Sequence, residues 1–122
     1  SATQDLIDAI NETTGIKAKA IIELTSDLPA VVSTNLYRIL QELINNTLKH
    51  ANATNIYVEI GSINRILTFI YEDNGIGFLI NDLNQKGMGL RNIKNRVEKM
   101  NGIISFEQKP SNGFSTVIEI PL

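Results

Sequence analysis

The sequence predicts an α+β fold, a two-layer sandwich in which helices cover one face of a mixed, mostly antiparallel sheet. Short segments that alternate apolar and polar residues outnumber the segments with helical spacing. Most of these strand segments follow one another along the chain, which favours pairing between sequence neighbours. The chain has 122 residues, enough for one domain that buries about two-thirds of its unfolded surface.

Composition excludes several classes of protein. The chain has no cysteine, which rules out disulfides and thiolate metal sites and fits a reducing compartment. The net charge of -2 and the scattered basic residues argue against nucleic-acid binding. No apolar run approaches the roughly 20 residues of a membrane span, and no signal peptide opens the chain. We expect a cytoplasmic domain without direct membrane contact, excised from a parent that is anchored, if at all, through another segment.

The first third of the chain predicts a helix, a strand and the start of a second helix. Residues 3–14 place apolar side chains at helical spacing, and Gly15 follows in position to end that helix. Residues 16–24 alternate as a half-buried strand does. After a loop, Ser33 or Thr34 is expected to cap the central helix.

The remaining elements follow from alternation, glycine positions and one further helical stripe. Alternation predicts an antiparallel hairpin and a final strand pair, and glycines mark the turns and the end of the last helix. The hairpin strands are predicted at residues 56–60 and 66–72, joined by a turn at 61–65 that starts with Gly61. A glycine turn (73–77), a loop (78–86), a helix (90–100) and two strands (103–108 and 114–120) follow.

The central helix, which contains residues 37–50, carries two different faces. One face, which includes Thr47 and Leu48, is mostly apolar and suited to a core. The polar side chains lie opposite: Arg38, Glu42, Asn45, Asn46 and Lys49. Asn45, Asn46 and Thr47 each give up roughly half a kcal/mol of helix propensity against alanine. Because a merely solvated face would carry better helix formers, we interpret the row of carboxylate, amide and ammonium groups as a binding site.

Two glycine-containing segments complete a candidate nucleotide site. Asp73 ends an apolar strand, and its carboxylate can accept a hydrogen bond from an exocyclic amine such as that of adenine. Taken alone, the sequence Asp73-Asn74-Gly75 is also an ordinary turn. Gly87 and Gly89 directly precede a helix, whose free N–H groups can bind phosphate. Together with the polar helix face, these features predict a nucleotide with a hard metal ion.

In this order, the three segments resemble a known family. ELINNTLKHA (42–51), DNGIGF (73–78) and KGMGL (86–90) resemble the N, G1 and G2 boxes of the GHKL ATPases, which include gyrase, a heat-shock chaperone, a mismatch-repair ATPase and sensor histidine kinases. The chain looks most like the ATP-binding catalytic domain of a bacterial sensor histidine kinase, of the short-lid subfamily related to nitrate and lipid-fluidity sensors. The resemblance implies the Bergerat fold, an α+β sandwich.

The resemblance also implies a role for each matching residue. It places Asn46 on Mg²⁺ and Asp73 on the adenine amine, with Gly75 and Gly77 beside the base. Glu42 matches the acid that activates water in hydrolysing relatives, and with Asn46 it is the expected catalytic pair. The other residues implied at the phosphates or the base are Asn45, Lys49, Gly87, Met88, Gly89, Leu90 and Thr116.

The last strand departs from the pattern of many relatives. They have Gly-Thr before that strand, whereas here Gly113 is followed by Phe114, Ser115 and Thr116. Which of the two hydroxyl residues lies near adenine is left open at this stage.

The function implied is transfer of the γ-phosphoryl group of MgATP to a histidine on a separate helical dimerisation domain, with a response regulator reached indirectly. His50, at the end of the ligand-bearing helix, is expected to be a helix-terminal group and not the acceptor. Three alternatives stand beside this interpretation. One is a serine kinase of the anti-sigma-factor type, another a non-catalytic nucleotide switch, and the third an α/β module that binds no nucleotide.

Overall fold

The computed structural model describes residues 1–75, 90–109 and 113–122, and these form one sheet and its covering helices. The loop predicted at residues 78–86, together with Gly77, Gly87, Met88 and Gly89, lies outside the described residues. The strands are β1 (Lys17–Glu23), β2 (Asn55–Ile63), β3 (Ile66–Asp73), β4 (Ile103–Lys109) and β5 (Gly113–Pro121). The helices are α1 (Ala2–Thr13), α2 (Ala30–Asn46), its π-helical continuation η1 (Thr47–Ala51) and α4 (Leu90–Lys99).

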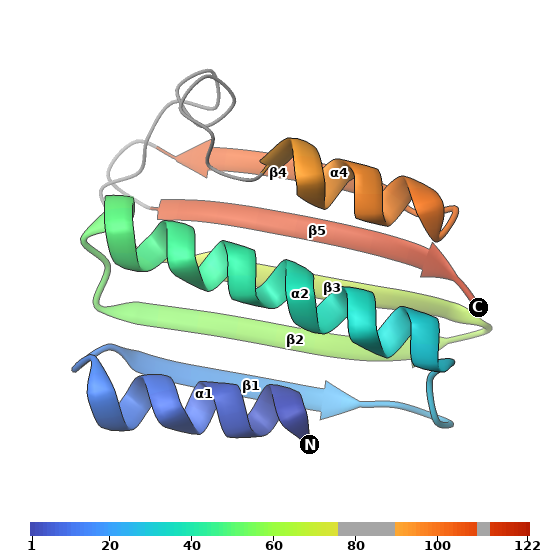
Figure 1. The fold of residues 1–122 in the computed structure, drawn as a ribbon, viewed down its shortest axis with the longest axis horizontal. Coiled ribbons are helices and arrows are strands. Elements are labelled where there is room, and N and C mark those ends of the chain that lie inside the picture. Colours follow the sequence, from blue (N-terminus) through green and yellow to red (C-terminus); the bar gives the residue numbers. More distant parts are fainter. Residues whose placement is uncertain (76–89, 110–112) are drawn as a thin grey trace.

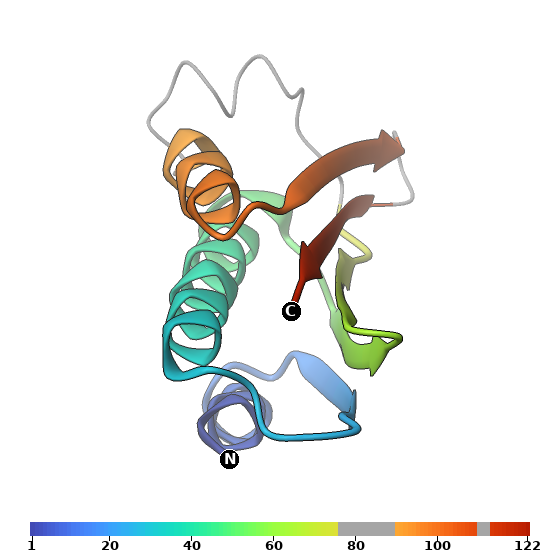
Figure 2. The ribbon, with the colours of Figure 1, turned by 90° about the vertical axis from the view of Figure 1, so that its right-hand side faces the viewer.

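The sheet has the order β1-β2-β3-β5-β4 (Figure 1). The pair β1 and β2 is parallel, and the other three pairs are antiparallel. The helices lie on one side of this sheet, as Figure 2 shows edge-on. The predicted α+β two-layer sandwich with a mixed, mostly antiparallel sheet is therefore confirmed.

One hydrophobic core fills the space between the two layers. Apolar side chains of α2 and α4 meet every second side chain of β2, β3 and β5, and the most deeply buried include Ile39, Leu40, Val58, Leu67, Phe69, Ile93, Val97 and Ile118. The period of two along each strand places Asp73 on the same face as this core. The sheet thus presents the end of β3 to the end of α2.

The helix α2 begins at Ala30, several residues before the predicted cap. Neither Ser33 nor Thr34 caps it, and the prediction is wrong there. Pro29 occupies the capping position, and its carbonyl accepts hydrogen bonds from the N–H groups of Val32 and Ser33. Because proline lacks an N–H, it fits the start of a helix, where that donor would have no helical partner.

The hairpin of β2 and β3 turns later than predicted. The strand β2 continues to Ile63, so only Asn64 and Arg65 form the turn, both with positive φ. A two-residue turn of this kind matches the twist of the two strands. Gly61, predicted to start the turn, instead pairs with Thr68 within the ladder.

The last turn of the central helix is wider than an α-helix. Residues 47–51 form the π-helical turn η1, and Asn52 then ends it with a left-handed backbone. Single π turns inside α-helices occur often at functional sites, where they rotate the following side chains. Here η1 begins at Thr47, directly after Asn46, and it faces the end of β3.

Candidate functional site

Asp73, the last residue of β3, is held by two hydrogen bonds. Its side chain is only 6% exposed. The Thr47 hydroxyl donates to Oδ2 at 2.9 Å, and the Gly75 backbone N–H donates to Oδ1 at 2.9 Å. A carboxylate has about four acceptor positions. The two bonds therefore fix the carboxylate in place and leave acceptor positions for an incoming amine.

Thr116 supplies a second polar group on the same face of the sheet. It lies opposite Tyr71 in the β3–β5 ladder, next to the pair of Asp73 and Phe114. The side chain is fully buried, and its hydroxyl has no hydrogen-bond partner among the described residues. A buried polar group left without a partner costs about 1–3 kcal/mol. This hydroxyl therefore has an unused donor and acceptor that a ligand or a water molecule could satisfy.

Ser115 is the other hydroxyl that the sequence left open. It pairs with Glu72, so it lies on the opposite face of the sheet from Asp73. Between the two candidates, the register favours Thr116 as the residue near a bound base.

The polar residues of the central helix do not share one solvent face, contrary to the prediction. Asn46 is only 8% exposed, Glu42 is half-buried, and Asn45 and Lys49 are exposed. Leu48, predicted to lie on the apolar side, is 41% exposed. The regular 3.6-residue period places Asn46 at the border of the buried face, and the π turn of η1 changes the directions of Leu48 and Lys49.

Glu42 and Asn45 line a shallow groove of about 330 Å³ between α1, α2 and α4, with Leu6 and Arg96 on its other walls. Thr47 faces the sheet, and residues two and five positions earlier on a helix point to the other side. The structure therefore brings Asp73, Gly75 and Thr116 to one end of the sandwich beside Thr47, the residue that follows Asn46. Glu42 and Asn45 open onto the outer side of α2.

Leu90 is the first residue of α4 and packs into the core. Its predicted contact with a nucleotide would therefore come from the backbone N–H groups at the start of this helix. The four other residues predicted around the phosphates and the base, Gly77, Gly87, Met88 and Gly89, are those outside the described residues.

Sequence reasoning missed two residues that support this site. The Asn74 side-chain oxygen accepts hydrogen bonds from the N–H groups of Thr54 at 2.9 Å and Asn55 at 2.8 Å, which ties the segment after η1 to the end of β3. Gly113 has φ +99°, and a Cβ there would meet the backbone of Asp73 and Asn74. The only sequence signals were an ordinary Asp-Asn-Gly turn and a glycine before a strand.

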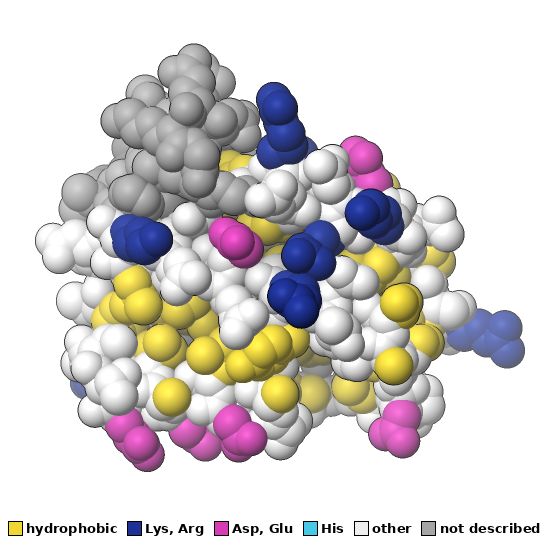
Figure 3. Space-filling model, in the orientation of Figure 1, with side chains coloured by type: hydrophobic (Ala, Val, Ile, Leu, Met, Phe, Trp, Pro, Cys, Tyr) yellow, Lys and Arg dark blue, Asp and Glu magenta, His cyan; other side chains and the backbone are white. Residues whose placement is uncertain are grey.

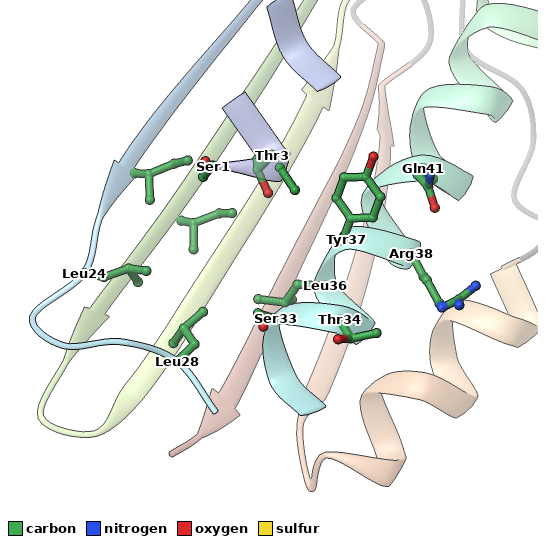
Figure 4. Close-up of a pocket in the computed structure, with 13 residues that line it drawn as sticks. Ser1, Thr3, Leu24, Leu28, Ser33, Thr34, Leu36, Tyr37, Arg38 and Gln41 are labelled. Atoms are coloured by element: carbon green, nitrogen blue, oxygen red, sulfur yellow. The ribbon is translucent and has the colours of Figure 1, made fainter. Parts of the chain in front are cut away.

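The candidate site is separate from the apolar groove at the other end of the sandwich. That groove, of about 610 Å³, is formed by the start of α1, the end of β1 and the first half of α2, with Leu24, Leu28 and Tyr37 among its walls (Figure 4). Figure 3 shows apolar side chains along the boundary between α1 and α2, with basic groups concentrated towards α4. None of the predicted nucleotide residues lines this groove.

Within 1–75, 90–109 and 113–122, no helix is both long and apolar enough to cross a membrane. The same residues contain no group of three His, Cys, Asp or Glu side chains arranged to hold a metal ion. Mg²⁺ commonly uses only one or two protein oxygen ligands beside phosphate and water. The amide oxygen of Asn46 and the carboxylate of Glu42 are hard donors of the required type.

Solved structures with the same fold include two histidine kinases. The blue-light activated histidine kinase of Erythrobacter litoralis EL346 superposes with a TM-score of 0.73 at 22% identity, over 98% of this chain and 40% of that chain. The mycobacterial sensor histidine kinase MprB superposes with a TM-score of 0.71 at 16% identity, over 98% and 92%. At these identities the similarity shows the fold.

Sequence comparison adds closer relatives. The sensor histidine kinase ComP of Bacillus subtilis is 38% identical over 100 residues, which are 80% of this chain and 13% of ComP. The histidine-protein kinase/phosphatase DegS of Brevibacillus brevis is 34% identical over 94 residues, 77% of this chain and 24% of DegS. The chain thus spans less than a quarter of the length of these two relatives.

A known family matches most of the chain. Residues 31–122, which contain the central helix, Asp73 and the start of α4, match the family described as histidine kinase-, DNA gyrase B-, and HSP90-like ATPase. The prediction of an ATP-binding domain of this group is thereby confirmed. The chain belongs to the histidine kinase-, DNA gyrase B- and HSP90-like ATPase family.

Proposed function

We propose that this chain is the MgATP-binding catalytic domain of a sensor histidine kinase, and that it delivers the γ-phosphoryl group to a histidine on a separate helical dimerisation domain. The observation that carries the proposal is the Asp73 carboxylate, fixed by Thr47 and Gly75 at the end of the core with acceptor positions left for an amine. The similarity to proteins named sensor histidine kinases supports the choice within the family.

The base would be recognised by Asp73 and Thr116. The carboxylate accepts a hydrogen bond from the adenine amine, and the buried Thr116 hydroxyl gains the partner it lacks among the described residues, directly or through water. Gly75 and Gly77 would lie beside the base. A site that hydrogen-bonds a substrate amine discriminates strongly against analogues without it, because its buried polar groups are then left unpaired.

The phosphates would be held by the end of the central helix and the start of α4. Asn46 would hold Mg²⁺, which when bound offsets the charge of the triphosphate. Asn45 and Lys49 contribute an amide and an ammonium near phosphate, and Glu42 positions the metal and a proton. The N–H groups of Gly87, Met88, Gly89 and Leu90 would bind the triphosphate oxygens.

Transfer places an acceptor imidazole in line with the leaving group. A bond forms between an imidazole nitrogen and the γ-phosphorus as the bond to the bridging oxygen of ADP breaks. In-line transfer requires the acceptor to approach the γ-phosphorus opposite the leaving ADP, and therefore from outside the rigid ATP site. Positioning of these groups supplies most of the catalysis. We place residues 1–122 as this one ATP-binding domain on the cytoplasmic side, with a response regulator receiving the phosphoryl group afterwards.

The test of the function is a labelling experiment with radiolabelled ATP. The chain alone is expected to bind MgATP without forming acid-labile phosphohistidine, because the backbone of His50, its only histidine, lies within η1 on the ligand-bearing element itself. Addition of the dimerisation domain of its own parent protein should produce label on that domain. Stoichiometric phosphohistidine at His50, or label on serine of a partner protein, would overturn the proposal.

The proposed metal ligand makes a second prediction. Asn46→Ala should lower the affinity for ATP by about tenfold or more in Mg²⁺ but change it little in EDTA, because an amide oxygen is a hard ligand for Mg²⁺. Fluorescent-nucleotide titrations in both buffers measure this. Gln41→Ala removes an amide at an exposed position of the same helix, outside the predicted nucleotide site, and is the matched control. Equal losses with and without metal would mean that Asn46 has a structural role only.

A further inference from the structure

Three side-chain oxygen atoms, from Tyr71, Thr47 and Asp73, lie close to one another and to the backbone carbonyl of Leu43. The Tyr71 hydroxyl lies 2.6 Å from the Thr47 hydroxyl, and the latter lies 2.9 Å from Asp73 Oδ2. Both hydroxyls also reach the Leu43 carbonyl, Thr47 at 3.1 Å and Tyr71 at 3.3 Å. Tyr71 is fully buried and Thr47 nearly so, which excludes solvent from the cluster.

The number of hydrogen atoms in this cluster is smaller than the number of acceptors. Tyr71 and Thr47 each have one hydroxyl hydrogen, whereas the Asp73 carboxylate and the Leu43 carbonyl only accept. If Thr47 donates to Leu43 or to Tyr71, Asp73 Oδ2 loses its donor. Only one order satisfies the two shortest contacts, 2.6 Å between the hydroxyls and 2.9 Å to Asp73: Tyr71 donates to Thr47, and Thr47 donates to Asp73.

Burial keeps Tyr71 in the form that can donate. Removal from water raises the pKa of the Tyr71 phenol well above its usual value, an effect that the Thr47 hydrogen bond partly offsets and the charge of Asp73 reinforces. Tyr71 is therefore a neutral phenol at neutral pH, and its hydrogen is present for Thr47.

We propose that Tyr71 is a positioning residue for base recognition, which acts through Thr47 by directing the Thr47 hydrogen towards the Asp73 carboxylate. The inference rests on the proposed function, in which that carboxylate receives the adenine amine. Without the Tyr71 hydroxyl, Thr47 turns to the carbonyl of Leu43, four residues earlier on its own helix, as threonines in helices commonly do. Asp73 then loses one of the two bonds that hold its orientation.

The effect is specific to the base amine, and this separates positioning from packing. A phenylalanine at position 71 keeps the ring and its burial, so contacts with the body of the base are retained. What weakens is the bond between Asp73 and the exocyclic amine. Nucleotides that lack this amine should therefore be indifferent to the change.

The experiment compares ATP with purine riboside triphosphate, which has hydrogen in place of the 6-amino group. The wild-type chain should prefer ATP. Tyr71→Phe and Thr47→Val should each weaken ATP binding by about fivefold to tenfold, the size of one net hydrogen bond, and leave binding of the analogue unchanged. The double variant should lose no more than Thr47→Val alone, because Tyr71 acts through Thr47.

Two further variants serve as controls. Thr47→Ser keeps the hydroxyl and should retain the preference for ATP. Tyr37→Phe removes a phenol from the first half of α2, beside the apolar groove, and should leave both affinities unchanged. Circular dichroism and thermal unfolding establish that each variant is folded, and Thr47→Val tests the same link should Tyr71→Phe be unstable.

The outcomes distinguish this inference from the proposed function. A wild-type chain that binds ATP and the analogue equally overturns the assignment of Asp73 to the amine, and this inference with it. A wild-type chain that prefers ATP, with a Tyr71→Phe variant that weakens both nucleotides equally or neither, overturns the positioning role alone.

Discussion

Asp73→Asn is expected to lower the affinity for ATP by about 100-fold or more while the chain stays folded. The amide has the shape of the carboxylate, but one of its two acceptor oxygens becomes an NH₂ donor. Since Gly75 N–H and the Thr47 hydroxyl both donate to this side chain, the remaining oxygen cannot serve them and an adenine amine together. One donor would then face the new amide NH₂, which is also a donor. Because the side chain is only 6% exposed, this contact opposes binding of the base.

The measurement is a nucleotide titration by calorimetry, with unfolding in urea as the test of folding. We expect the free energy of unfolding to fall by only about 1–2 kcal/mol, since one donor near Asp73 loses its acceptor. Glu72→Gln is the matched control, because the neighbouring residue makes the same chemical change on the exposed face of β3. Wild-type affinity in Asp73→Asn would remove Asp73 from the nucleotide site.

The sequence was sufficient for the sheet, because alternation located its strands. The family resemblance singled out Asp73 and Asn46, whose roles at a nucleotide stay predictions. Element ends were less predictable, because Gly61 indicates a turn by its type yet continues the β2 ladder opposite Thr68. The turn itself falls on Asn64 and Arg65, where the hairpin register decides.

Residues that act through distant partners could not be predicted. Thr47 and Tyr71 are 24 residues apart, and each fits a core position by its local period. Periodicity assigns a side chain to a face and says nothing of which polar atoms meet there. The burial of Asn46 was missed for a related reason, since it lies at the border of the apolar face, and the η1 turn that follows it has no clear signal in the sequence.

Gly113→Ala is expected to damage both stability and nucleotide binding. Gly113 has φ +99°, and an added Cβ would lie against the carbonyl group of Asp73 and within 2.9 Å of the Asn74 Cα. These neighbours are backbone atoms of the adjacent strand β3, which cannot move aside as a flexible side chain can. The methyl group must therefore push Asp73 and the turn after it away from β5, and the carboxylate moves with them.

Gly15→Ala provides the control that separates this clash from backbone strain. Gly15 also has positive φ, at +75°, but a Cβ there meets nothing within 4 Å. It should cost only the strain of a left-handed alanine, about 1 kcal/mol of unfolding free energy, and leave ATP affinity unchanged. Gly113→Ala should cost about 2 kcal/mol more than this control and weaken ATP binding about tenfold or more. Urea unfolding and nucleotide titration of the two variants side by side measure both effects. Equal stability of the two variants, with unchanged ATP affinity, would show that the close approach of β5 to Asp73 does not position the carboxylate.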